Sequence, residues 1–168
     1  MPKSFTALAC LLGVLAFGIG PRADAHDPAA TVAATDKDIE SGAVEAVRVV
    51  EAFGEALQAN RIEGASRLLA EDVLVLESGG AERSRAQYLA EHAAADAAYL
   101  QGAEQQVTAR RARVAGDLAW VGTETRTPTH KDGKSRTSLG TETMVLRRTD
   151  AGWRIVHIHW SSRAAAQP

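Results

Sequence analysis

Hydrophobic residues recur at every second position through most of the second half of the chain, and this pattern limits the fold more than any other feature. Four segments show it, and turns rich in glycine and aspartate separate them: Gln105–Val114, Leu118–Thr127, Ser135–Arg148 and Trp153–Ser161. Period-two patterning between such turns predicts β-strands. Because the four strands follow one another directly, they are expected to form an antiparallel meander.

Helical periodicity dominates the sequence that precedes these strands. Apolar residues three or four positions apart predict a helix from about Gly42 to Ala59, and Ser41 is a candidate cap for it. A shorter helix is expected from about Ile62 to Ala70. A short apolar strand, Val73–Glu77, follows.

A capping-box spacing marks the start of a third helix. Ser84 and Gln87 are three residues apart, so the helix is expected to begin there and to run to about Leu100. Helices that precede a meander of strands indicate an α+β fold rather than a parallel βαβ arrangement.

The N-terminal sequence has the features of an export signal. Lys3 supplies a positive start, an apolar run follows from Phe5 to Ile19, and Ala23-Asp24-Ala25 fits the small-x-small cleavage rule. The apolar run is shorter than the roughly 20 residues that a membrane-spanning helix needs. We therefore expect a signal peptide at residues 1–25 and a flexible leader at 26–41, and a periplasmic or secreted protein.

Composition supports one domain without disulfides. The single cysteine, Cys10, lies within the expected signal, so cleavage leaves no thiol. The formal net charge of −2 gives no electrostatic reason to expect binding to nucleic acid, or to a membrane after signal cleavage. The expected domain covers residues 42–163, with a tail at 164–168.

The C-terminal sequence adds a resemblance to a known family. Trp153–Ser161 reads W-R-I-V-H-I-H-W-S, and together with the order of elements it resembles the nuclear transport factor 2-like superfamily. That superfamily includes ketosteroid isomerase, scytalone dehydratase and the SnoaL-like polyketide cyclases. The sequence Glu77-Ser78-Gly79-Gly80 and the helix that carries Tyr88 and His92 are also similar to small SnoaL-like members.

This resemblance implies a cone-shaped, curled antiparallel sheet packed against three N-terminal helices. The cone encloses a cavity for a small molecule, and subunits pair through their sheets, so a homodimer is expected. The implied activity is acid–base chemistry of the isomerase, cyclase or dehydratase type on a small apolar carbonyl compound, without a cofactor. A noncatalytic periplasmic ligand-binding or accessory protein and a histidine-based metal-binding protein are the alternatives.

Two histidines in the last strand are the most prominent candidates for chemistry. His157 and His159 are two residues apart, so their rings are expected on one face of the strand, together with Trp153, Ile155 and Ser161. The alternation of side chains along the strand does not decide whether this face lines the cavity.

The hairpin before the last strand leaves two registers open. A four-residue loop at 149–152 places His159 opposite Glu142, whereas a three-residue loop places His159 opposite Thr143. Both loops suit the sequence.

The predicted catalytic residues are His157, His159 and Glu77. An imidazole titrates near neutral pH, and a carboxylate that continues an apolar strand is a candidate general base. The alternative is that both histidines only form hydrogen bonds to neighbouring strands. No metal is predicted; the alternative metal site consists of His92, His157 and His159.

Four further residues complete the predicted ligand-binding set. Tyr88 and His92 are four residues apart and share a helical face, while Trp120 and Glu142 lie in strands of the meander. Ordinary core packing is the competing explanation for the aromatic members.

Overall fold

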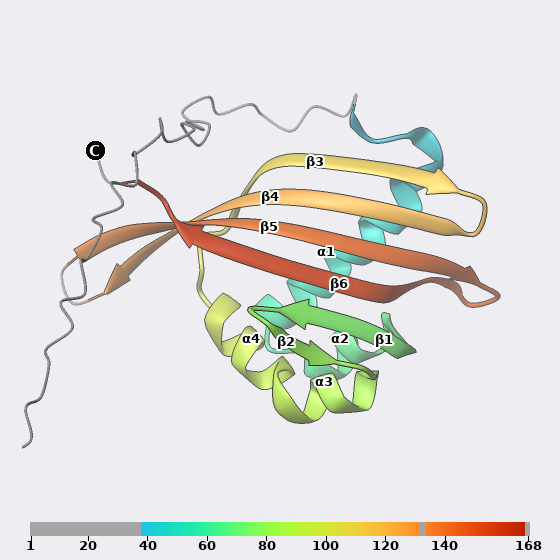
Figure 1. Cartoon of the computed structure of the whole chain (residues 1–168), viewed down its shortest axis with the longest axis horizontal. Helices are drawn as coiled ribbons and strands as arrows, with labels where there is room; N and C mark the ends of the chain where they lie inside the picture. The colour runs from blue at the N-terminus through green and yellow to red at the C-terminus, as the bar shows by residue number, and fades with distance from the viewer. Residues whose placement is uncertain (1–37, 132–133, 167–168) are drawn as a thin grey trace, which may run out of the picture. The chain divides into compact units, whose positions relative to one another are not determined.

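The computed structural model describes residues 38–131 and 134–166, and the expected signal at 1–25 lies outside them. The helices are α1 (Val44–Gln58), α2 (Ile62–Ser66), α3 (Arg85–Glu91) and α4 (Ala93–Leu100), and a 3₁₀ turn, Ser41–Ala43, precedes α1. The strands are β1 (Leu69–Glu77), β2 (Gly80–Glu82), β3 (Gln106–Ala115), β4 (Leu118–Lys131), β5 (Lys134–Thr149) and β6 (Gly152–Ala164) (Figure 1). Of the expected leader, only residues 38–41 are described.

Six strands form one curled sheet in the order β2-β1-β6-β5-β4-β3. The meander β3 to β6 is antiparallel, as expected. The prediction of a wholly antiparallel sheet is wrong, because β1 pairs in parallel with β6. No hairpin joins these two strands, so no turn fixes their relative direction, and the sheet is mixed.

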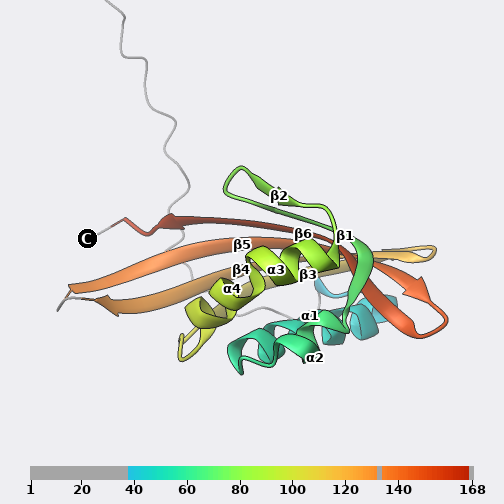
Figure 2. The ribbon, with the colours of Figure 1, turned by 90° about the horizontal axis from the view of Figure 1, so that it is seen from below.

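Helix α1 packs on one face of the sheet and supplies much of the core. Its buried residues repeat at helical spacing, and they include Val47, Val50, Phe53 and Leu57. Figure 2 shows α1 and α2 on one side of β5 and β6. The helix therefore buries its apolar stripe against the sheet, which is where most of the stability of such a helix originates.

The helix expected from Ser84 to Leu100 is divided in two. Its start is confirmed, because Ser84 Oγ accepts a hydrogen bond from the Gln87 backbone N–H at 3.1 Å. The backbone at His92 leaves the helical conformation, with φ −123° and ψ −31°, so α3 ends before this residue and α4 begins after it. The expected third helix is thus two helices that meet at His92.

A bulge in β6 decides which residues face the helices. Near the turn, Arg148 pairs with Trp153, as the four-residue loop predicts. The register then shifts, because Leu146 pairs with Ile155 but Val145 pairs with His157. Val156 is left without a partner on β5, as an extra bulged residue is.

Because of this bulge, the side chains along β6 do not alternate between the two faces of the sheet as expected. Ile155 and Ile158 are both fully buried, although they are three residues apart. Beyond the bulge, His157 and His159 therefore lie on the face opposite to Trp153 and Ile155. The prediction that the histidines share the face of those two residues is wrong because it assumed unbroken alternation.

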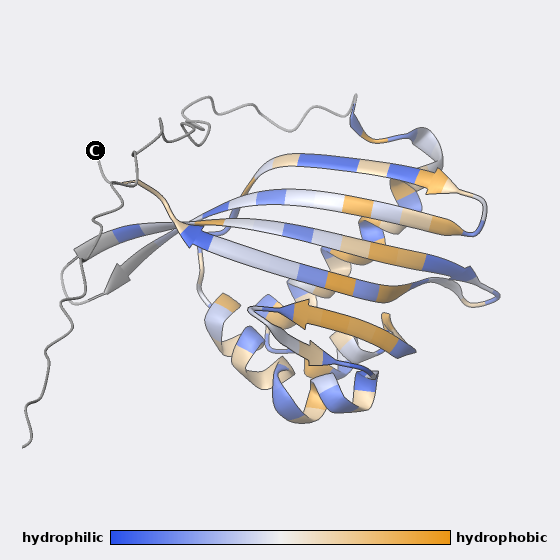
Figure 3. Cartoon of the chain, viewed as in Figure 1, coloured by the Kyte–Doolittle hydropathy of each residue, from blue (hydrophilic) through white to orange (hydrophobic). Residues whose placement is uncertain are grey.

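The helix-facing side of the sheet is apolar in one half and polar in the other. Figure 3 shows the hydrophobic parts of β4, β5 and β6 side by side. The buried residues there include Val121, Met144, Leu146, Ile155 and Ile158.

Among the described residues, none of the helices combines the length and the hydrophobicity needed to cross a membrane.

Candidate functional site: a polar row in the cavity

A cavity of about 500 Å³ lies between α1, α4 and the polar half of the sheet. Its volume is within the range of small-molecule sites. Phe53 and Leu57 contribute apolar surface from α1, while threonines of β4 contribute hydroxyl groups. The cavity thus offers an apolar body and a limited set of polar groups to a ligand.

One row of cross-strand neighbours runs through this cavity wall. The register pairs Arg110 of β3 with Thr123 of β4, Thr123 with Glu142 of β5, Glu142 with Trp160 of β6, and Trp160 with Glu77 of β1. All five line the cavity. We call these five residues the polar row.

Glu142 is the central carboxylate of the polar row. Trp160 Nε1 donates a hydrogen bond to Glu142 Oε2 at 2.8 Å, and Thr123 also hydrogen-bonds this carboxylate. Burial raises the pKa of Glu142, while the two hydrogen bonds and the charge of Arg110 act in the opposite direction. Glu142 is therefore a half-buried acid with a raised pKa that its donors hold in a fixed position, as a general base requires.

Arg110 supports this arrangement and is itself neutralised. Its Nε donates to Thr123 Oγ1 at 3.3 Å, and its Nη1 lies 2.5 Å from Glu51 Oε1. Only 12% of its side chain is exposed. Arg110 thus orients Thr123 and pairs with Glu51 from α1.

A second cavity of about 280 Å³ adjoins the first and shares Glu77, Asp96 and Trp160 with it. The Tyr88 hydroxyl donates to Asp96 Oδ2 at 2.8 Å. Burial raises the pKa of Asp96, and the nearby charge of Glu82 raises it further. The pKa of Glu77 is also raised, first by burial and then by the charge of Asp96.

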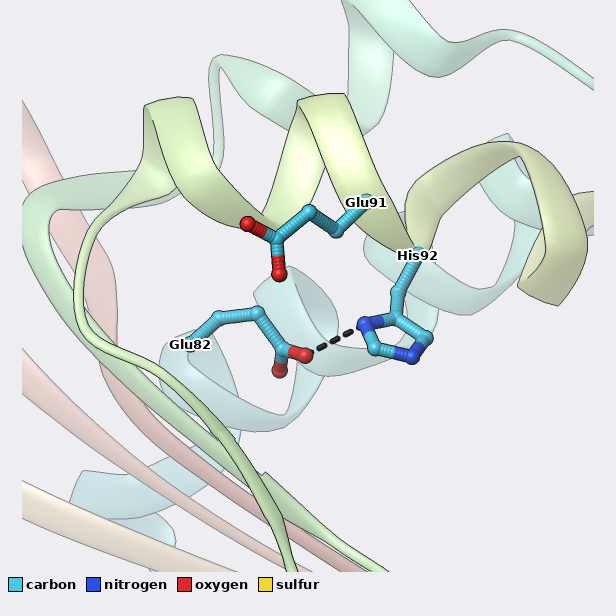
Figure 4. A group of neighbouring side chains, drawn as sticks. All are labelled: Glu82, Glu91 and His92. Carbon is cyan, nitrogen blue, oxygen red and sulfur yellow. Dashed lines mark ion pairs between the residues drawn. The ribbon is translucent and has the colours of Figure 1, made fainter.

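Glu82, Glu91 and His92 lie together at the edge of the second cavity (Figure 4). His92 Nδ1 contacts Glu82 Oε1, and Glu82 is only 4% exposed. One donor atom from each residue lies within 4.8 Å of the others, so the group offers nitrogen and carboxylate ligands of the kind that zinc accepts. Within the described chain, this metal-ligand group differs from the expected alternative of His92, His157 and His159.

The predicted site residues divide into two sets. Glu77, Tyr88, His92 and Glu142 line one or both cavities. His157, His159 and Trp120 line neither, and they belong to the opposite face of the sheet.

The two histidines have different surroundings on that face. His157 Nδ1 is 3.0 Å from the backbone oxygen of Leu74, as the hydrogen-bonded alternative expects, and His159 is exposed. The catalytic roles expected of His157 and His159 stay predictions.

The polar row also contains residues that the sequence did not single out as a site. Arg110 and Thr123 occupy strand positions without a site signal of their own, and alternation left open whether the face that carries Trp160 lines the cavity. The period-two pattern places alternate residues of β3 and β4 on one face of the sheet. The five residues of the polar row become neighbours only through the pairing of β3, β4, β5, β6 and β1.

Comparison with known proteins identifies the family of the chain. The family model of the SnoaL-like domain matches residues 46–166. The chain belongs to the SnoaL-like domain family. No curated protein matches the sequence.

Solved structures share the fold of this SnoaL-like protein. A proposed ketosteroid isomerase from Shewanella frigidimarina NCIMB 400 is 33% identical, with a TM-score of 0.68, over 73% of this chain and 99% of that one. A proposed dehydratase of the NTF2-like family from Streptomyces avermitilis is 21% identical (TM-score 0.62; 77% and 99% covered). An NTF2-like protein from Novosphingobium aromaticivorans is 22% identical (TM-score 0.58; 70% and 79% covered). The nuclear transport factor 2-like fold expected from the sequence is confirmed.

Proposed function

We propose that this SnoaL-like protein is an enzyme that moves a proton on a small carbonyl compound, with Glu142 as the general base. The observation that carries the proposal is the half-buried Glu142 carboxylate on the cavity wall, held by Trp160 and Thr123. The relative named as a proposed ketosteroid isomerase supports the reaction class. The proposal keeps the expected export signal at 1–25, which would place the reaction in the periplasm or outside the cell.

The proposed step breaks a C–H bond next to the substrate carbonyl. Glu142 takes the proton, and the electron pair left on carbon moves to the carbonyl oxygen as an enolate. The hydroxyl groups that the threonines of β4 contribute to the cavity would donate hydrogen bonds to that oxygen. Return of the proton from Glu142 to a different carbon would complete an isomerisation.

Exchange of protons for deuterium tests this step without knowledge of the natural substrate. We expect the protein to catalyse deuterium incorporation from D₂O next to the carbonyl of small apolar ketones, measured by loss of the proton NMR signal. Saturable binding of the same ketones without exchange would favour the noncatalytic ligand-binding protein instead.

The proposed homodimer interface is the face of the sheet opposite to the cavities. A cross-strand row on this face contains Trp120, Val145, His157 and Leu74, and Trp120 remains 42% exposed. Exposed large apolar residues in adjoining strands are typical of surfaces that another protein covers. A two-fold dimer would bury this row against its own copy.

Trp120→Lys is expected to convert the dimer to a monomer, because it places two charges at the symmetric contact. Light scattering during size-exclusion chromatography measures the mass. Val44→Lys, at an exposed apolar residue on α1, is the control and should leave the dimer intact. A monomeric parent protein would contradict the dimer, and a dimeric Trp120→Lys variant would contradict this interface.

A further inference from the structure

The two adjoining cavities have an excess of acidic residues. Among the described residues that line them, six are acidic and two carry basic side chains. The acidic residues are Glu51, Glu55, Glu77, Glu82, Asp96 and Glu142, and the basic ones are Arg110 and His92. The walls that face a ligand are therefore predominantly negative when these carboxyl groups are ionised.

Neither basic side chain is positioned to receive an anionic ligand. The Arg110 guanidinium is largely buried, with Nη1 on Glu51 and Nε on Thr123. His92 Nδ1 contacts the buried carboxylate of Glu82. Each of the two basic side chains thus already pairs with a carboxylate of the protein, which offsets its attraction for an anionic ligand.

Among the described residues, three carboxylates on or near the shared wall have no cationic partner at hydrogen-bond distance. Glu142 is held by the neutral donors Trp160 and Thr123, and Asp96 accepts from the hydroxyl of Tyr88. Within the same part of the chain, Glu77 forms no ion pair. Burial and the charge of Asp96 raise the pKa of Glu77, the charge of His92 lowers it, and the charge of Glu82 raises it.

Aromatic rings adjoin the same wall. The ring centroid of Trp160 lies 6.4 Å from that of Phe53 and 6.4 Å from that of Tyr88. Trp160 lines both cavities, as Glu77 and Asp96 do, and Glu77 is its cross-strand neighbour on β1. Carboxylates next to an aromatic ring are a suitable environment for an organic cation.

We propose that the cavity selects an amine, a compound with an apolar body and a positively charged ammonium group, and that it rejects carboxylates and phosphates. The ammonium group lies at the wall formed by Glu77, Asp96 and Trp160, and the apolar body lies toward Phe53 and Leu57. This inference rests on the proposed function and specifies its substrate class as a carbonyl compound that also carries an ammonium group.

Three compounds with the same phenylalkyl body test this selectivity: 4-phenylbutan-2-amine, 4-phenylbutan-2-one and 4-phenylbutanoate. Isothermal titration calorimetry measures the Kd of each compound for the protein at neutral pH. We expect the amine to bind at least tenfold more tightly than the carboxylate, because the attraction and the repulsion act in opposite directions at one wall. The ketone is expected to fall between them.

Two variants locate the source of the preference. Glu77→Gln is expected to weaken binding of the amine severalfold while leaving the Kd of the ketone nearly unchanged, since only a charge is lost. Glu124→Gln makes the same change at an exposed residue of β4 that does not line the cavities, and it should alter neither Kd.

The results separate this inference from the proposed function. If the ketone binds and exchanges its protons but the carboxylate binds as tightly as the amine, the selectivity is wrong and the proposed function stands. If the amine binds and no ketone undergoes exchange, the selectivity stands and the proton-transfer function is wrong. If none of the three compounds binds, both are wrong.

Discussion

Glu142→Gln is expected to lower kcat for deuterium exchange of ketones about 10²- to 10⁴-fold, the range of a general base. Glutamine keeps an oxygen that can accept the hydrogen bond from Trp160 Nε1, but it cannot take a proton from carbon. The fold should persist, because the raised pKa of Glu142 means that its ionised form does not stabilise the fold at neutral pH, so removing the charge costs no stability. Exchange rates from NMR and thermal unfolding measure the two effects separately.

The pH dependence of the exchange rate of the parent protein tests the ionisation of Glu142. The base must be ionised, so the exchange rate should fall as the pH is lowered through the raised pKa of Glu142, which lies above the ordinary glutamate value of 4.5. Glu124→Gln, on the other face of the sheet, is the matched control and should exchange at the parent rate. Parental exchange by a folded Glu142→Gln variant would contradict the role of this carboxylate.

Phe53→Ala is expected to lower the free energy of unfolding by about 3–5 kcal/mol, as phenylalanine truncations in cores do. Phe53 is fully buried on α1, and its ring stacks on Trp160 with an interplanar angle of 18°. The variant leaves a void where α1 meets the sheet and removes a ring from the cavity wall. Denaturant unfolding at neutral pH measures the loss of stability.

Val44→Ala on the same helix is the control for this change. Val44 is 38% exposed, so its truncation should cost much less than that of Phe53. A loss below about 1 kcal/mol for Phe53→Ala would show that α1 is not packed on the sheet as described. Ligand binding should weaken in Phe53→Ala even under conditions where the variant remains folded.

Local patterns were sufficient where the structure depends on near neighbours. The capping box formed by Ser84 and Gln87 was predicted because both partners lie within one helical turn. Alternation and turn residues predict the four strands of the meander, and their bounds agree within one residue except at the C-terminal ends of β4 and β6. The division of the helix at His92 was missed, because no proline or glycine marks it.

The pairing of strands that are far apart in the chain could not be predicted from the sequence. The strand β1 was found from its valines and leucines, but its parallel pairing with β6 depends on contacts between residues about 80 positions apart in the chain. Sequence periodicity carries no information about the direction of such a pair. For the same reason the polar row could not be assembled before the order of the strands was known.

The last strand shows most clearly what the sequence determined and what it did not. The sequence alone predicted the strand and its hairpin turn, but it left two registers open, of which the structure has the one that pairs Arg148 with Trp153. Tertiary structure decided that Val156 bulges, so that Ile155 and Ile158 both enter the core and Trp160 reaches Glu142. The physical reason is that a strand alternates strictly only while its ladder is unbroken, and packing against α1 and β1, rather than local sequence, selects where one extra residue is accommodated.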